Sequence, residues 1–382
     1  RAASVTWLLL SLAAGLTEAR ACFLDGLAAF ESGRLPEAAR HFEAALELAP
    51  GRPSVMLNLG ITRMRLGQPR QAMNLLEQVT ALEPEDPAAW FHRAGAHAQL
   101  GQLEASVAAW DRLLALDPRA VDAWVHRGSA LRELGRLDAA ADSFRRARAL
   151  GGDATLLDYY LAGSGATADG VPQAAPRDYV AQLFNEYADE FGAHLVQALR
   201  YEAPERLVTA LPAPAAGHWK AVLDLGCGTG LVGALLRPSA KHLVGLDLAE
   251  GMVRRAQASG HYDVVEHADL VPWLDATGQR FDLVMAADVF IYVGALEPVF
   301  AGVRRVLVPG GVLAFSVETP DTSEAGGLVL RPSLRYAHAE AYVRDLAARH
   351  GLPVLSAQRG PLREDQKRPV AGQYWVLQAP ST

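Results

Sequence analysis

A period of 34 residues runs through the N-terminal half of the chain and constrains its fold more than any other feature. Four positions of the repeat carry the same kind of residue from one repeat to the next, and we call each set of equivalent residues a column. They are Gly33, Gly67, Gly101 and Gly135; Pro50, Pro84 and Pro118, with Gly152 in the fourth place; the large Phe42, Leu76, Trp110 and Phe144; and the small Ala38, Ala72, Ser106 and Ala140. A repeat of this length cannot bury an apolar face alone, so successive repeats must stack on one another.

Each column has a physical task in a pair of helices. We expect the glycine to form the turn after a first helix and the proline to stop the second. The small residue lets the two helices approach, and the large residue fills the groove between pairs. The columns therefore predict a solenoid of helix pairs.

These repeats resemble the tetratricopeptide family over about residues 19–152. Trp90 and Trp124 stand at the aromatic position of the first helix, and Gly26, Gly60 and Gly128 stand at its close-packing position. The resemblance implies a concave face that binds a peptide or a protein partner. An array that only solubilises, braces or dimerises the chain is the alternative, and a homodimer is one form of it.

Composition limits the function classes. Half of the 382 residues are hydrophobic, enough for about two globular domains. The net charge is −7, and residues 1–150 hold 17 acids and 17 bases, so the excess acid lies in the C-terminal part. A sequence pI near 5.9 argues against a nucleic-acid partner. Cys22 and Cys227 are too few for a disulfide framework or a cysteine-ligated zinc site, so we expect no metal centre and a reducing compartment.

Residues 1–18 contain the apolar run Trp7–Leu16 behind a single basic residue, Arg1. This run fits either a secretory leader or a buried helix that leads into the repeats. It is too short to span a bilayer, so we expect no membrane segment. The cytoplasm is the expected location.

The second half of the chain has a different pattern. Residues 163–177 are rich in Gly, Ala and Pro and predict a linker after a capping helix that ends the array at residue 162. Apolar residues at helical spacing then predict a helix over Tyr179–Leu199, across a sheet edge or over a cleft. Short apolar runs that alternate with amphipathic helices follow, which favours a parallel sheet. The expected strands are Ala221–Leu225, His242–Asp247, Asp263–Asp269, Phe281–Asp288 and Val312–Glu318, with a final edge hairpin of Pro353–Gln358 and Tyr374–Gln378.

The first expected strand runs into LDLGCGTG, residues 223–230. Glycines at the carboxyl end of a parallel strand let a ligand approach the backbone. The dinucleotide fingerprint G-x-G-x-x-G would need glycine at Leu231, which disfavours an NAD-dependent oxidoreductase. The acid two residues before the loop, Asp224, suits a cationic aminoacyl ligand better than a pyrophosphate.

Later strand ends repeat the acidic pattern. Asp247 stands where a carboxylate can accept hydrogen bonds from two ribose hydroxyls, and Leu248 and Met252 can form an apolar wall for a purine. An amide N–H and the carboxylate at Ala268 and Asp269 can form hydrogen bonds with the edge of an adenine ring. The fourth strand ends at Ala287 and Asp288.

Together these motifs resemble the class I S-adenosylmethionine-dependent methyltransferases over residues 178–382. FNEYADEFGAHL and RYAHAEAYV add a resemblance to bacterial methyltransferases that carry tetratricopeptide repeats. The resemblance implies a helical solenoid followed by a Rossmann-like domain whose mostly parallel sheet has seven strands and flanking helices. It also implies S-adenosylmethionine as the cofactor, and a cofactor site built from Tyr179, Phe184, Tyr187, Asp224, Gly226, Cys227, Gly228, Gly230, Asp247, Leu248, Met252, Ala268, Asp269, Leu270, Ala287 and Asp288.

The sequence indicates less clearly which residues bind the methyl acceptor. The aromatic residues of Tyr179–Leu199 form either a lid over the sulfonium or a buried core face. His338 or His194 can supply a general base. Tyr292, Tyr336 and Arg335 can orient an acidic or phenolic acceptor. His338 also fits a capping or surface position. The acceptor itself, a small molecule or a protein, stays open, and a scaffold that binds cofactor without catalysis is the alternative function.

Overall fold

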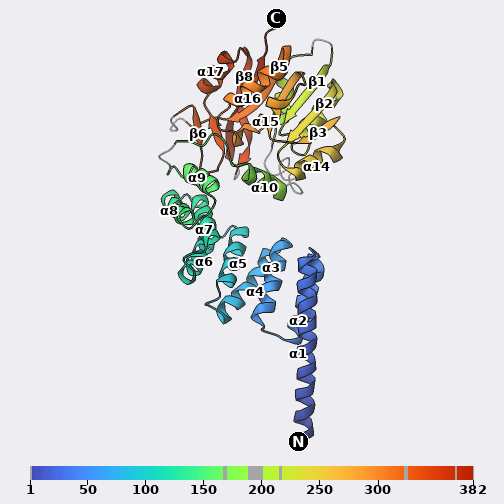
Figure 1. Ribbon diagram of the computed structural model, residues 1–382, viewed down its shortest axis with the longest axis vertical. Helices are drawn as coiled ribbons and strands as arrows, with labels where there is room; N and C mark the ends of the chain where they lie inside the picture. The colour runs from blue at the N-terminus through green and yellow to red at the C-terminus, as the bar shows by residue number, and fades with distance from the viewer. Residues whose placement is uncertain are drawn as a thin grey trace. The chain divides into compact units, whose positions relative to one another are not determined.

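The computed structural model describes residues 2–166, 170–187, 201–214, 217–321, 326–365 and 368–381, with side chains from residue 15 onward. It divides into two compact units, Arg1–Leu157 and Asp158–Thr382 (Figure 1). Each unit is described by itself. The division falls inside the helix α9 (Ala154–Gly163), whereas the sequence placed the whole of that helix with the repeats.

The first unit is a series of antiparallel helix pairs (Figure 1). The four turn glycines have φ between 69° and 73°, a left-handed conformation that glycine adopts without a steric penalty. Each proline of the repeat stands two residues after the end of a second helix, as predicted. The helices are α1 (Ala2–Glu31), α2 (Leu35–Leu48), α3 (Pro53–Arg65), α4 (Pro69–Leu82), α5 (Pro87–Gln99), α6 (Leu103–Leu116), α7 (Val121–Glu133) and α8 (Leu137–Ala149).

Each pair is held by one large side chain that enters a gap left by a small residue. A Cβ atom built on Gly26 would lie 2.6 Å from the ring of Phe42, and one built on Gly128 would lie 2.5 Å from the ring of Phe144. Both rings are fully buried. Phe42 and Phe144 of the large column therefore depend on the close-packing glycines of the preceding helices, because a single added methyl group would collide with each ring.

The apolar run Trp7–Leu16 lies within α1. In the part of the chain that the structure describes, no helix is both long enough and apolar enough to cross a membrane.

The second unit is built on one sheet whose strand order is β3-β2-β1-β4-β5-β7-β6, with β9 paired to β5 and β8 paired to β9. Its described strands are β1 (Trp219–Leu225), β2 (Ala240–Asp247), β3 (Val264–His267), β4 (Phe281–Ala286), β5 (Leu307–Glu318), β6 (Leu328–Leu330), β7 (Tyr336–His338), β8 (Val354–Asp365) and β9 (Arg368–Gln378). Each of the five strands predicted before the final hairpin overlaps one of β1 to β5.

The sheet is mixed and has nine strands in the described residues, where seven mostly parallel strands were expected. β1 to β5 are parallel, but β9 runs antiparallel to β5 and β8 antiparallel to β9. Only two residues separate the end of β8 from the start of β9, too few for a parallel pair, which needs a long crossover. The predicted hairpin is confirmed, although β9 lies inside the sheet and only β8 is at its edge.

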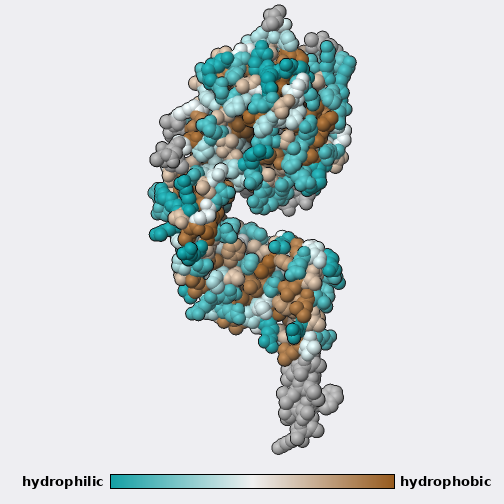
Figure 2. Space-filling model, viewed as in Figure 1, coloured by the Kyte–Doolittle hydropathy of each residue, from teal (hydrophilic) through white to brown (hydrophobic). Residues whose placement is uncertain are grey.

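Helices cover both faces of this sheet (Figure 1). They are α12 (Ala203–Ala210), α13 (Leu231–Leu236), α14 (Glu250–Ser259), α15 (Leu270–Ala276), α16 (Glu297–Val306) and α17 (Glu340–Arg349), with short 3-10 turns η1 (Arg237–Ser239) and η2 (Phe290–Tyr292). Two apolar clusters result, one around Phe300 and Phe315 and the other around Val222 and Tyr374. Hydrophilic residues cover most of the visible surface of this unit in Figure 2. A buried parallel sheet needs such double cover.

The expected linker is partly bound to the second unit. Tyr336 donates a hydrogen bond from its hydroxyl to the carbonyl of Pro172 at 2.9 Å, and Ala295 donates from its amide to the carbonyl of Gln173 at 2.7 Å. The amide of Ala175 donates to the carbonyl of Tyr292 at 3.1 Å. Residues 172–175 are therefore a strap that leads into α10 (Arg177–Tyr187).

Helix α9 is anchored beside this strap. The hydroxyl of Tyr159, which is buried, donates to the carbonyl of Leu334 at 2.6 Å. Its ring lies 5.7 Å from that of Tyr179 and 6.1 Å from that of Tyr336, measured between centroids. The aromatic cluster ties the C-terminal part of α9 to the second unit.

Replacing Gly128 by alanine tests the packing of the repeats. We expect Gly128→Ala to lower the free energy of unfolding by about 1 to 3 kcal/mol, because the new methyl group would force the Phe144 ring from its place. Gly95→Ala, also in a first helix, is the matched control, since the nearest atom to its Cβ is 3.9 Å away. That control should be neutral or slightly stabilising. Urea unfolding of the full chain, followed by circular dichroism, measures both; equal effects would contradict the packing account.

Candidate functional site

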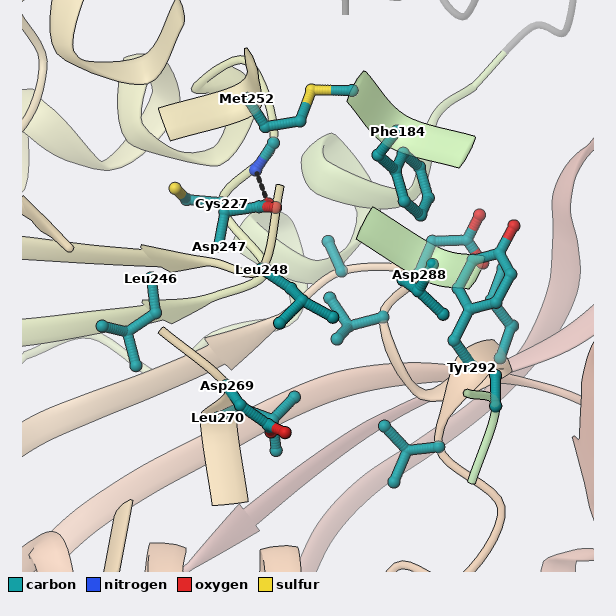
Figure 3. Close-up of a pocket in the computed structure, with 18 of the residues that line it drawn as sticks. Phe184, Cys227, Leu246, Asp247, Leu248, Met252, Asp269, Leu270, Asp288 and Tyr292 are labelled. Carbon is teal, nitrogen blue, oxygen red and sulfur yellow. Dashed lines mark hydrogen bonds between the residues drawn. The ribbon is translucent and has the colours of Figure 1, made fainter. Parts of the chain in front are cut away.

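One pocket of about 670 Å³ lies at the carboxyl ends of the parallel strands. This is the edge where open α/β sheets bind ligands, and the volume is in the range of small-molecule sites. Its wall is formed by the ends of β1, β2 and β4, the segment after β3, the strap and α10. Figure 3 shows Asp247, Leu248, Asp269 and Leu270 on one side of the pocket and Asp288 and Tyr292 on the other.

The glycine loop after β1 forms the floor of the first side. Gly226, Gly228 and Gly230 have φ of 65°, 53° and 98°. A Cβ atom on Gly226 would lie 2.5 Å from the side chain of Val289, so the loop passes too close to its neighbour for another residue. Conformation therefore favours glycine at all three positions, and the space at Gly226 requires it.

Asp247, at the end of β2, braces this loop. One of its carboxylate oxygens accepts a hydrogen bond from the amide of Gly228 at 2.9 Å (dashed line in Figure 3). The other accepts from the amide of Ala249 at 2.9 Å. Burial raises the pKa of Asp247, and these amide donors oppose the rise. A carboxylate has about four lone-pair sites, so the group can accept a further hydrogen bond from a ligand.

Asp224 lies beneath the loop and is not part of the pocket lining. The hydroxyl of Tyr262 donates to it at 2.7 Å and accepts from the amide of Gly233 at 3.1 Å. The second oxygen of Asp224 is buried without a hydrogen-bond partner in the described structure. Burial raises the pKa of Asp224 to about 7, the Tyr262 hydrogen bond lowers it in part, and the charge of Asp247 adds to the rise.

The rest of the first side of the pocket is an apolar wall that includes one acid, Asp269. Leu248 and Met252 line it, and Leu270 faces them across the space in Figure 3. Asp269 caps the helix α15 through a 3.3 Å hydrogen bond from the amide of Val271. Arg177, from the start of α10, pairs with the other oxygen of Asp269 at 3.0 Å.

The second side of the pocket contains a buried ion network. Asp288 has φ of 59°, a rare conformation for a residue with a side chain, and its amide donates to the hydroxyl of Ser316 at 2.8 Å. Both oxygens of Asp288 accept from Arg363, at 2.8 and 2.6 Å. Arg363 also donates to Glu318, which Arg331 contacts at 3.0 Å. Burial alone would lower the pKa of Arg363, but the charges of Asp288 and Glu318 raise it.

Two phenols and another arginine complete this side. The ring of Tyr292 meets that of Phe184 edge to face, 5.4 Å between centroids. Burial raises the pKa of Tyr292, and the nearby charge and hydrogen bond of Arg335 oppose that rise. Burial also raises the pKa of Tyr201, whose hydroxyl donates to the carbonyl of Ala287 at 3.3 Å. Both phenols therefore stay protonated near neutral pH.

The pocket brings together most of the residues expected at a cofactor site. Those that line it are Phe184, Gly226, Cys227, Gly228, Asp247, Leu248, Met252, Ala268, Asp269, Leu270, Ala287 and Asp288, joined by Tyr292 from the acceptor set. Asp224 and Gly230 lie just outside the lining. Tyr179 packs instead against Tyr159 and Tyr160 at centroid distances of 5.7 and 6.0 Å. The side chain of Tyr187, and His194 altogether, lie outside the described residues.

His338 does not line the pocket, although it was a candidate base. It is fully buried in β7, and its Nε2 atom lies 2.8 Å from the carbonyl of Gly294 and 3.1 Å from that of Val293. Burial lowers the pKa of His338 to about 4, against the effect of these carbonyls. A neutral imidazole that donates from Nε2 joins β7 to the turn η2, a structural position that gives no contact with a ligand in the pocket.

Several lining residues were not expected from the sequence. Ala174, Ala175 and Arg177 come from the segment that composition predicted as a linker, and Arg363 and Tyr201 come from regions without a motif. The strand β8 carries Arg363 across the sheet to Asp288, a placement that depends on the pairing of β8 with β9. The sequence held no clear signal for Arg363, because β8 carries several polar residues, including a second arginine, Arg359.

Comparison with known proteins identifies both parts of the chain. The family described as "Methyltransferase domain" matches residues 223–315. Two families described as "Tetratricopeptide repeat" match residues 29–91, 64–121 and 96–154. The repeats and the methyltransferase-type domain inferred from sequence are both confirmed.

Curated relatives match the second unit. A malonyl-(acyl-carrier protein) O-methyltransferase of Enterobacter lignolyticus is 30% identical over 185 residues, 47% of this chain and 68% of the relative. The enzyme of the same name from Brevibacillus brevis is 30% identical over 146 residues, 36% of this chain, and the match spans half of the relative's length. The structure of the N-methyltransferase NodS from Bradyrhizobium japonicum with S-adenosyl-L-homocysteine is 20% identical, with a TM-score of 0.39, and covers 47% of this chain and 86% of NodS.

The raised pKa of Asp224 predicts how stability depends on pH. Between about pH 4 and pH 7 the folded protein keeps a proton that the unfolded chain has lost, so this group makes stability fall as pH rises. Asp224→Asn removes that contribution, up to about 1.4 kcal/mol per pH unit. Urea unfolding at about pH 5 and about pH 6.5 measures the two slopes. Asp275→Asn, at an exposed acid, should keep the wild-type slope. An unchanged slope in Asp224→Asn contradicts the assignment.

Proposed function

The chain belongs to the S-adenosylmethionine-dependent methyltransferases and carries tetratricopeptide repeats, and we propose that it transfers a methyl group to an acceptor recruited by the repeat array. The observation that carries this proposal is the pocket itself, where a glycine loop and acids from successive strand ends surround one apolar space. The pocket also favours an enzyme over a non-catalytic scaffold. A second set of polar groups lines its second side, away from the residues assigned to the cofactor.

The residues on the first side fit S-adenosylmethionine. The carboxylate of Asp247 has free lone pairs for the ribose hydroxyls, and the wall of Leu248, Met252 and Leu270 suits a purine. Asp224 lies beneath the loop with a buried oxygen that has no partner in the described structure, and a cationic aminoacyl group above the loop would offset its charge. The bare glycine backbone lets the ligand pass directly over the loop. We assign Asp269 to the adenine amino group, where it would have to share its carboxylate with Arg177.

When bound, the cofactor supplies an electrophilic methyl group on a sulfonium. Phe184 and Tyr292, which meet edge to face, then close the side of the pocket next to the acceptor. Their rings exclude water from a displacement in which charge is lost, and a dry, oriented site favours that reaction. Arg363 holds Asp288 in its strained conformation, so the wall beside the reacting atoms is rigid.

The repeat array is assigned to partner recognition. Stacked helix pairs present an extended concave surface, which is the usual binding face of such solenoids. The partner is the protein acceptor, a protein that carries the acceptor, or a second copy of the chain. We place the enzyme in the cytoplasm, since a reducing interior suits Cys22 and Cys227 as free thiols.

Replacing Asp247 tests the cofactor site. We expect Asp247→Ala to weaken binding of S-adenosylmethionine by about 1 to 3 kcal/mol, because hydrogen bonds to a charged group are lost and the loop loses its brace. Asp275→Ala is the control at an exposed acid of the same unit. Calorimetric titration measures both variants, with NAD as the comparison ligand. Binding of NAD in place of S-adenosylmethionine would contradict the proposal.

Deletions separate recruitment by the array from support of the pocket. Removing residues 1–153 keeps α9 and the strap, so we expect cofactor affinity to stay within about twofold while transfer to a recruited acceptor falls. Removing residues 1–176 takes away Tyr159 and the strap that lines the pocket, and we expect cofactor binding to weaken strongly. If the shorter deletion abolishes cofactor binding, the array supports the site instead of recruiting a partner.

A further inference from the structure

We propose that Tyr262 is a positioning residue of the cofactor site. Its hydroxyl joins Asp224 to the start of α13 and holds Asp224 as the carboxylate that offsets the charge of the cofactor. The inference rests on the proposed function and adds to it a residue that no sequence motif marks. Tyr262 lies between α14 and β3 and does not line the pocket, so it acts through Asp224 and the glycine loop, without contact with the ligand.

Three glycines leave room for the ring of Tyr262. A Cβ atom built on Gly233, in the first turn of α13, would lie 2.4 Å from a carbon of this ring. One built on Gly245, within β2, would lie 3.0 Å from the ring, and one built on Gly230, in the loop after β1, would lie 3.3 Å from it. Neither Gly233 nor Gly245 has a positive φ, so the ring, and not the backbone conformation, requires glycine there. Three separate segments thus fix the ring beneath the loop.

The hydroxyl of Tyr262 makes two hydrogen bonds with a defined direction. It accepts from the amide of Gly233 at 3.1 Å and donates to a carboxylate oxygen of Asp224 at 2.7 Å. Gly233 is the third residue of α13, and the N-cap of that helix, Gly230, has no side chain that could accept from its amide. The phenol oxygen therefore takes the place of a capping side chain. Because the oxygen accepts from this amide, its proton points to Asp224.

Asp224 depends on this donor to stay ionised. It is 1% exposed, and its other oxygen has no hydrogen-bond partner in the described structure. Burial raises the pKa of Asp224 to about 7, the hydrogen bond from Tyr262 opposes this rise, and the charge of Asp247 adds to it. Cys227 and Tyr201 also face Asp224, so the titratable groups around it in the described residues include no cation. The phenol is therefore the group that favours the carboxylate.

This arrangement couples cofactor binding to a proton. Burial, followed by the negative charge of Asp224, raises the pKa of Tyr262 above its usual value, so the phenol remains a donor while Asp224 titrates. A cationic aminoacyl group above the loop favours the ionised form of Asp224, as the phenol does. Binding of the cofactor therefore releases the proton of Asp224, and affinity should rise with pH through about 7.

The pH dependence of cofactor binding tests this inference. The full chain and its Tyr262→Phe variant are titrated calorimetrically with S-adenosyl-L-homocysteine at about pH 5.5, about pH 7.5 and about pH 9. Dividing the two dissociation constants at each pH removes the titration of the ligand, which both proteins share. At about pH 7.5 we expect the variant to bind roughly tenfold more weakly, because Asp224 loses its donor and keeps its proton. At the other two pH values the ratio should fall to about threefold or less, since Asp224 is protonated in both proteins or ionised in both.

Two further variants separate this role from general support of the fold. Tyr342→Phe is the matched control, because it also removes a hydroxyl that accepts from an amide at the start of a helix, that of Leu296 at 2.9 Å. Tyr342 does not line the pocket, so this variant should bind like wild type at every pH. Asp224→Asn removes the titrating group, so we expect weaker binding without a step near pH 7. Adding Tyr262→Phe to Asp224→Asn should change the affinity by less than about twofold, because the phenol acts through the carboxylate.

The outcomes separate this inference from the proposed function. Wild-type affinity in Tyr262→Phe at about pH 7.5, or a loss by the same factor at all three pH values, overturns the role of Tyr262 and leaves the methyltransferase intact. If Tyr262→Phe does not fold, a wild-type affinity without a pH step, or a step that persists in Asp224→Asn, overturns it in the same way. Failure of the wild-type chain to bind S-adenosyl-L-homocysteine overturns the proposed function, and this inference with it.

Discussion

The hydrogen bonds that Asp247 accepts from the amides of Gly228 and Ala249 hold the site together, since they join the ends of β1 and β2. A loop with three left-handed glycines has much conformational entropy to lose, and two charge-assisted hydrogen bonds offset part of that cost. Tyr262 supports the same loop from below by connecting Asp224 with Gly233. The pocket therefore has a rigid floor before any ligand arrives, and its acids are already positioned by the protein's own amides and hydroxyls.

The second side of the pocket depends on a different constraint, which is the burial of charge. Asp288, Arg363 and Glu318 are largely removed from water; Arg363 pairs with both acids, and Arg331 pairs with Glu318. Such a network is costly to break, so it fixes the end of β4 against β5 and β8. With S-adenosylmethionine assigned to the acidic side, the arginine side is left for the acceptor. The same protein thus presents two electrostatic environments within one cavity.

The repeats and the strap show how local packing rules differ between the two units. In the array each large side chain fills the gap above a small residue of the same helix pair, so stability comes from nearest neighbours. In the second unit the strap is held by single hydrogen bonds from residues far away in the sequence, such as Tyr336 to Pro172. A composition rich in Gly, Ala and Pro is compatible with a free linker and with a bound strap. It disfavours regular helix and strand, but it does not prevent hydrogen bonds to other segments.

The sequence by itself determined the repeat, the positions of the five parallel strands along the chain and most of the acidic side of the pocket. These follow from periodicity and from the rule that parallel strands end at one edge, and both are local or fixed by topology. Only the tertiary structure decided that β9 pairs with β5, that His338 is buried away from the pocket, and that Arg363 meets Asp288. Each of these depends on contacts between residues that are distant in the chain. No spacing rule records such contacts, since they arise when the whole sheet is assembled.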